Sequence, residues 1–155
     1  MSAASRWAPA LLWVVPALWS ANYLVARLAT MHCDARRDFV GHVGGDDFML
    51  IFQSSNWRQR CKNIIQDFGR EALALFDESA RRSGGIHSED RHGVRRFFPC
   101  TTLAVGAVHV TPGRFRHAEE VANVAATAKH EAKQTATGLV LHTGMPAADL
   151  NMLVA

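Results

Sequence analysis

The residues best suited to chemistry form the run Gly44-Gly45-Asp46-Asp47, which lies between two strand-like segments. Residues 38–52 alternate apolar and small or polar side chains on either side of it, so the sequence predicts a β-hairpin with this run as its turn. Adjacent carboxylates could hold a hard cation such as Mg²⁺ and, through it, nucleotide phosphates. The glycines lack a Cβ and allow a ligand close to the backbone. Taken alone, the run fits a tight turn with solvated acids equally well.

Length and composition indicate one globular domain with a short addition. The 155 residues are 48% hydrophobic and carry a net charge of +3. Residues 1–30 hold +2 of this charge through Arg6 and Arg27 and contain no acid, so the remainder carries only +1. This balance does not predict a nucleic-acid partner. The cysteines are isolated and odd in number and the histidines are scattered, so neither a disulfide framework nor a zinc site is predicted.

The N-terminal segment differs from the rest of the chain. Residues 7–29 are mostly apolar, contain three of the four tryptophans, and have no charge before Arg27. This length matches about one membrane thickness, so the sequence predicts a transmembrane helix, with an amphipathic or unstructured leader as the alternative. Residues 18–27 resemble the first helix of drug/metabolite transporters. One helix cannot form a transport path, so it would serve as an anchor.

The remaining periodicities predict two helices and two strands after the hairpin. A helix with a break near Gly69 is expected, then a polar loop with a short hairpin around 90–93. A β-branched strand, an Ala-rich helix and a last strand follow, and the tail is unassigned. The expected ranges are 57–80, 81–96, 101–111, 117–134, 138–142 and 144–155.

Several of these segments resemble the GGDEF (diguanylate cyclase-like) family, in register, over residues 38–143. The turn followed by Phe48 is the family signature, with Asp47 where Glu is usual. Residues 103–108 resemble its Ser-Ile-Gly-Val strand and residues 125–133 its closing helix. The Gly-Gly-Asp-Asp-Phe variant, a preceding Gly-His-Val and a Ser-Glu-Asp-Arg loop are most similar to the C-terminal domains of EAL–CBS–GGDEF proteins.

The resemblance implies an α+β fold, a partial nucleotidyl-cyclase palm with an antiparallel-centred sheet and packing helices, preceded by the transmembrane helix. The expected domains are an anchor over residues 1–30, a truncated GGDEF domain over residues 31–143, and a tail over residues 144–155. GGDEF domains act as dimers that join two GTP molecules into cyclic di-GMP with Mg²⁺. A homodimer on the cytoplasmic side of the inner membrane of a bacterium is therefore implied.

Residue roles follow from the same resemblance. It implies that Asp46 and Asp47 are the catalytic and metal-binding acids and that Gly44, Gly45 and Lys133 contact nucleotide. Asp38 matches one residue of the family's product-inhibition site, a remnant because Ala35 stands where that site has Arg.

Other parts of the family pattern are missing. Nothing in residues 1–37 resembles the first strand, which carries another metal-binding Asp, or the guanine contacts. Ala136 and Thr137 stand where the family has Gly and a phosphate-contacting Arg. We therefore expect a degenerate protein of cyclic di-GMP signalling without cyclase activity, acting by interaction or residual nucleotide binding. The alternatives are an active diguanylate cyclase and a non-functional remnant of a gene fusion.

Overall fold

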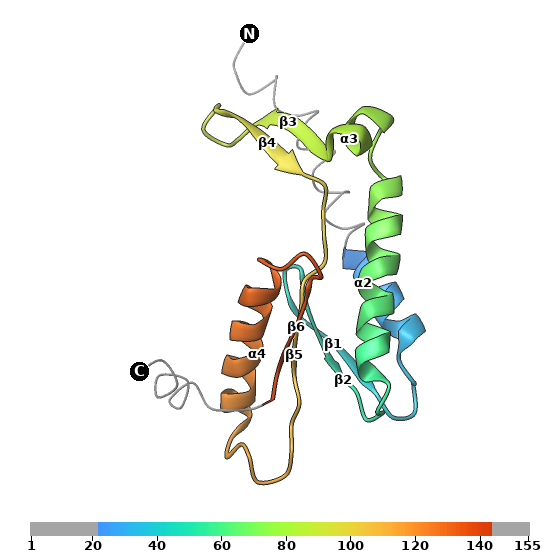
Figure 1. The fold of residues 1–155 in the computed structure, drawn as a ribbon, viewed down its shortest axis with the longest axis vertical. Coiled ribbons are helices and arrows are strands. Elements are labelled where there is room, and N and C mark those ends of the chain that lie inside the picture. Colours follow the sequence, from blue (N-terminus) through green and yellow to red (C-terminus); the bar gives the residue numbers. More distant parts are fainter. Residues whose placement is uncertain (1–21, 144–155) are drawn as a thin grey trace. The chain divides into compact units, whose positions relative to one another are not determined.

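The computed structural model describes residues 22–143, which divide into two compact units meeting in sequence at Cys100 and Thr101. The first unit holds a helical segment, two hairpins and two helices, and the second holds two strands and a helix (Figure 1). The elements in chain order are the helical segment 22–32, β1 (Phe39–Gly44), β2 (Asp47–Ile51), α2 (Trp57–Ala74), α3 (Glu78–Ser83), β3 (Gly85–Glu89), β4 (Arg95–Pro99), β5 (Val105–Val108), α4 (Ala118–Ala132) and β6 (Leu139–His142).

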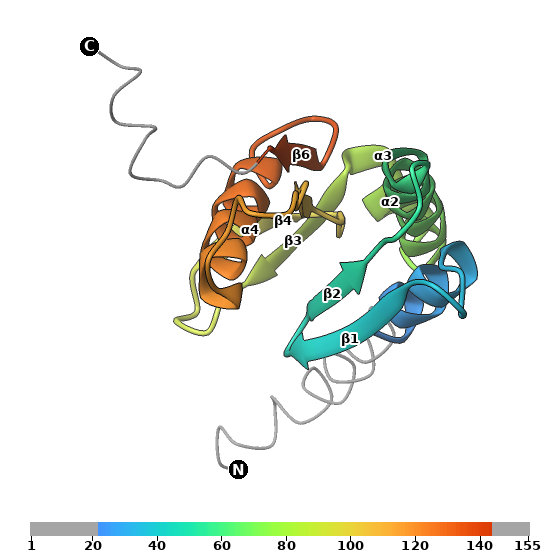
Figure 2. The ribbon, with the colours of Figure 1, turned by 90° about the horizontal axis from the view of Figure 1, so that it is seen from below.

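The predicted α+β class is confirmed, but the expected single sheet is not what the described residues form. They form three separate two-stranded sheets, of which β1–β2 and β3–β4 are antiparallel and β5–β6 is parallel. A wider sheet centred on the β1–β2 hairpin (Figure 2) would need a strand along one of its edges. The segment that precedes the hairpin is helical and supplies no such strand.

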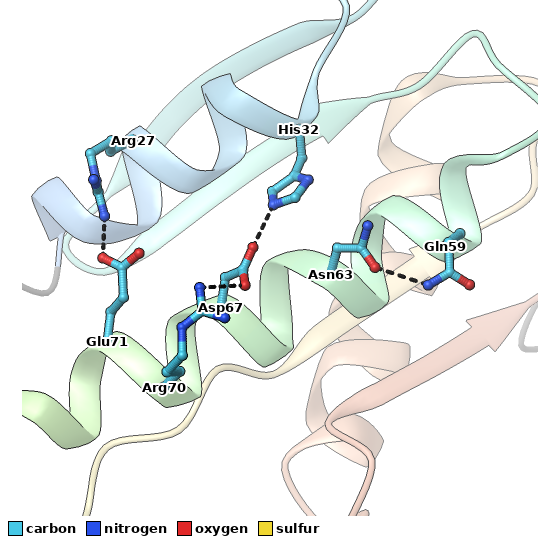
Figure 3. A network of polar contacts seen from close by, with 7 residues as sticks. All are labelled: Arg27, His32, Gln59, Asn63, Asp67, Arg70 and Glu71. Atoms are coloured by element: carbon cyan, nitrogen blue, oxygen red, sulfur yellow. Dashed lines mark hydrogen bonds and ion pairs between the residues drawn. The ribbon is translucent and has the colours of Figure 1, made fainter.

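The core of the first unit lies between the helical segment 22–32 and α2. Arg27 pairs with Glu71, and His32 Nε2 lies 2.8 Å from Asp67 Oδ2 (Figure 3). Since the residue numbers rise on one helix as they fall on the other, the two helices run antiparallel. Between them lie the buried apolar side chains Leu24, Val25, Leu28, Ala29, Cys61, Ile64, Phe68 and Ala72.

This packing changes the interpretation of the apolar N-terminal run. Residues 22–29, the last third of the expected transmembrane helix, contribute to a protein core, with Leu28 at 1% exposure and Ala29 at 0%. Among residues 22–143, no helix combines the length and apolarity needed to cross a bilayer. The helical segment also runs across the expected domain boundary at residue 30. The anchor stays a prediction for residues 7–21, which lie outside the described residues.

The helical region after the first hairpin is interrupted at a different place from the one expected. α2 continues through Gly69 and ends at Ala74, and α3 begins at Glu78. The Asp77 side chain caps α3 by accepting a hydrogen bond of 2.7 Å from the Ala80 amide. The predicted short hairpin is confirmed as β3–β4, with its turn at residues 90–94.

The second unit is a β-α-β arrangement. The parallel strands β5 and β6 pair from Val105 with Leu139 to Val108 with His142, and α4 packs on both. β5 is much shorter than the expected strand over 101–111. The contact between strand and helix is closest at Gly106, where a Cβ atom would lie 2.2 Å from the Lys129 amide nitrogen. The tail after residue 143 lies outside the described residues.

Candidate functional site

The predicted turn forms the tip of the β1–β2 hairpin. Gly44 pairs with Asp47 after a shift in strand register, and Gly44 and Gly45 have φ angles of 151° and 58°. Side chains rarely adopt these backbone conformations, which explains glycine at both positions. No atom lies within 4 Å of a Cβ built on either residue, so the space beside the turn is open.

Two side chains hold the turn through one carbonyl group. The Asn22 side-chain amide donates to the Gly45 oxygen at 2.9 Å, and His42 Nε2 lies 3.0 Å from the same oxygen. The His42 ring also packs against Phe48, with ring centroids 4.9 Å apart. For His42 to donate to a carbonyl, its proton must be on Nε2. The tip of the hairpin is therefore fixed both to its own strand and to the start of the helical segment 22–32.

The two predicted metal-binding acids differ in their surroundings. Asp46 is exposed at the tip, whereas Asp47 is half-buried at the start of β2. Among residues 22–143, no group of three or more His, Cys, Asp or Glu side chains could hold a metal ion. Mg²⁺ is often bound through one or two carboxylates, with water and phosphate oxygens completing its shell. Asp46 and Asp47 thus fit a single Mg²⁺ brought by a nucleotide, and not a closed protein site.

Asp38 has a structural role in the first unit. Its carboxylate accepts hydrogen bonds from the amides of Asp34 at 2.8 Å and Gln53 at 3.0 Å, and Arg60 Nη1 lies 2.5 Å away. These two amides, together with the Arg60 guanidinium, hold the pKa of Asp38 below its ordinary value. The side chain has 0% exposure. A ligand could reach this predicted inhibitory-site residue only by displacing partners that close the base of the hairpin.

Lys133 belongs to the second unit. It caps the C-terminus of α4, where its amide donates to the Lys129 carbonyl at 3.2 Å and its side chain is exposed. The predicted nucleotide-binding residues are thus divided between the units, with the glycines and acids of the turn in the first and Lys133 in the second.

Sequence reasoning missed the residues that hold the turn and the hairpin base. Asn22 was placed inside a membrane helix, and Arg60 lies 22 positions from Asp38. One available signal was the pattern of the segment itself. Its apolar residues recur at helical spacing around the polar Asn22 and the charged Arg27, which is typical of a helix packed on one face only.

Comparisons with protein-family models, with curated proteins and with solved structures found no match to this chain.

Proposed function

We propose that this protein is a degenerate relative of GGDEF domains that retains weak, Mg²⁺-dependent binding of a guanine nucleotide, GTP or cyclic di-GMP, without cyclase activity. The observation that carries the proposal is the geometry of the β1–β2 tip. Two glycines in side-chain-excluding conformations leave open space beside the backbone, and the exposed Asp46 carboxylate stands next to it.

The tip offers a nucleotide two kinds of contact. The open backbone at Gly44 and Gly45 allows phosphate oxygens to approach closely. Mg²⁺ held by the phosphates would take one or two of its remaining ligands from Asp46 and Asp47. Since the Asn22 and His42 contacts fix the Gly45 carbonyl, the turn needs little rearrangement to accept such a ligand.

Cyclase chemistry asks for more than the tip supplies. Joining two nucleotides needs charge stabilisation by metals held on both sides of the transferring phosphoryl group. In this chain the segment before the hairpin is a helix, and it contributes to the turn the neutral Asn22 amide, not a carboxylate. Losing one preorganised electrostatic contact costs on the order of a hundred- to a thousandfold in rate.

Calorimetric titration of the full chain tests the binding proposal. GTP and cyclic di-GMP are titrated with and without Mg²⁺ into wild type, Asp46→Ala and the control Glu119→Gln, which removes an exposed carboxylate from the first turn of α4. We expect Mg²⁺-dependent binding that Asp46→Ala abolishes and Glu119→Gln leaves unchanged. A folded wild-type chain that binds neither nucleotide would refute nucleotide binding, and formation of cyclic di-GMP from GTP would refute the loss of cyclase activity.

A further inference from the structure

One face of the β1–β2 hairpin is apolar and open. The strand register places Phe39 opposite Ile51 and Gly41 opposite Met49, so these four residues share a face. The Phe39, Met49 and Ile51 side chains are 51%, 47% and 46% exposed. Two-stranded sheets are marginal in water without a covering element, and contiguous exposed apolar patches usually have a partner.

The apolar N-terminal run is too short to cross a membrane once its last part is assigned to the core. Residues 22–29 are packed against α2, with all four of their larger or inward apolar side chains below 9% exposure. The uncharged residues that remain are 7–21. As a helix they would measure about 22 Å, compared with about 30 Å for the hydrocarbon layer of a bilayer.

This remaining run enters the described structure beside the hairpin. Its next residue, Asn22, donates a hydrogen bond of 2.9 Å to Gly45 at the hairpin tip. β1 is 6 residues long, which corresponds to about 20 Å, and residues 7–21 could reach about 50 Å if extended. The whole apolar face therefore lies within reach of residues 7–21.

We propose that residues 7–21 fold back onto the open face of the β1–β2 hairpin and cover Phe39, Met49 and Ile51. The composition of the segment suits this role, because Trp7, Trp13 and Trp19 supply large apolar surfaces in a stretch without charge. The cover is an intramolecular contact and is independent of whether the tip binds a nucleotide.

Tryptophan fluorescence of the full chain in lipid-free buffer tests this contact. Trp57→Phe leaves only the three N-terminal tryptophans as reporters. In this background we expect blue-shifted emission and weak quenching by acrylamide from a monomeric protein. Ile51→Lys, which places a charge on the proposed contact face, should shift the emission to the red and increase quenching. Leu75→Lys, a control at a 67% exposed site after α2, should change neither.

Three results would overturn the proposal. One is emission from solvated tryptophan in the Trp57→Phe protein, and another is an equal response to Ile51→Lys and Leu75→Lys. The third is a chain that has no monomeric fraction without lipid and floats with phospholipid vesicles, which would favour membrane insertion of residues 7–21. A monomer that stays out of the vesicle fraction and responds only to Ile51→Lys would support the intramolecular cover.

Discussion

Adding one methyl group at Gly106 should destabilise the second unit strongly. A Cβ atom at this position would lie 2.2 Å from the Lys129 amide nitrogen and 2.7 Å from the Ala128 carbonyl carbon. Ordinary van der Waals contacts begin near 3.4 Å. The atoms in the way belong to the backbone of α4, so no side chain can rotate aside. The helix itself must move away from β5 by about 1 Å, which weakens its dispersion contacts with both strands.

The size of the effect follows from this displacement. Overpacking a well-packed site costs about 1–3 kcal/mol, and a rigid backbone neighbour places Gly106→Ala at the upper end, at about 3 kcal/mol. A loss of this size lowers the melting temperature of a small domain by roughly 10 °C or more. Gly69→Ala is the matched control, because it adds the same methyl group inside α2, where no atom lies within 4 Å of the built Cβ. It should stabilise the first unit by about 1 kcal/mol.

Circular dichroism at increasing temperature and urea concentration measures both variants in the full chain. The expected result is opposite signs for the same chemical change, with Gly106→Ala less stable and Gly69→Ala more stable than wild type. If Gly106→Ala unfolds within about 0.5 kcal/mol of wild type, the close contact between β5 and α4 is refuted.

Three further predictions concern the first unit. Asp77→Ala removes the cap bond to the Ala80 amide and should cost about 1 kcal/mol, seen as faster amide exchange in α3, while Asp77→Asn should retain most of the protection. Asp38→Ala leaves Arg60 without its carboxylate and should cost about 3 kcal/mol in urea unfolding, with a smaller loss when Arg60→Met is added. Because the folded-state pKa of Asp38 is lowered, its contribution is fully present above its unfolded pKa of about 3.9 and is lost as the pH falls through the folded value. The urea midpoint should therefore drop below about pH 4, and Asp38→Asn should flatten that drop; an equally steep drop in Asp38→Asn would contradict this assignment.

The elements that sequence reasoning located correctly are those whose signals are local. Alternating apolar residues around two glycines identified the β1–β2 hairpin, and a turn-rich stretch around Asp90 identified β3–β4. The Ala-rich helix and the last strand also lie within one or two residues of their expected bounds. In each case the residues that decide the structure are close together in the sequence.

The residues that could not be predicted depend on distant partners. Hydropathy does not distinguish a helix buried against another helix from one in lipid, and the difference at residues 22–29 comes from α2, which begins at Trp57. Asp38 matched a ligand-binding position, and only the folded chain brings the Gln53 amide and Arg60 to its carboxylate. Gly69 has a low helix propensity, yet the contacts of α2 on both sides of it override that preference.

The β1–β2 hairpin is restrained at both ends, at its base by Asp38 and at its tip by Asn22. A hairpin held in this way has little conformational entropy left to lose when something binds it. Its turn is preorganised, so the affinity of any ligand there depends on the number and quality of the contacts, not on the cost of ordering the backbone. Replacing Asn22 by Ala would remove one restraint, and a ligand would then bear an ordering cost that the native helix has already met.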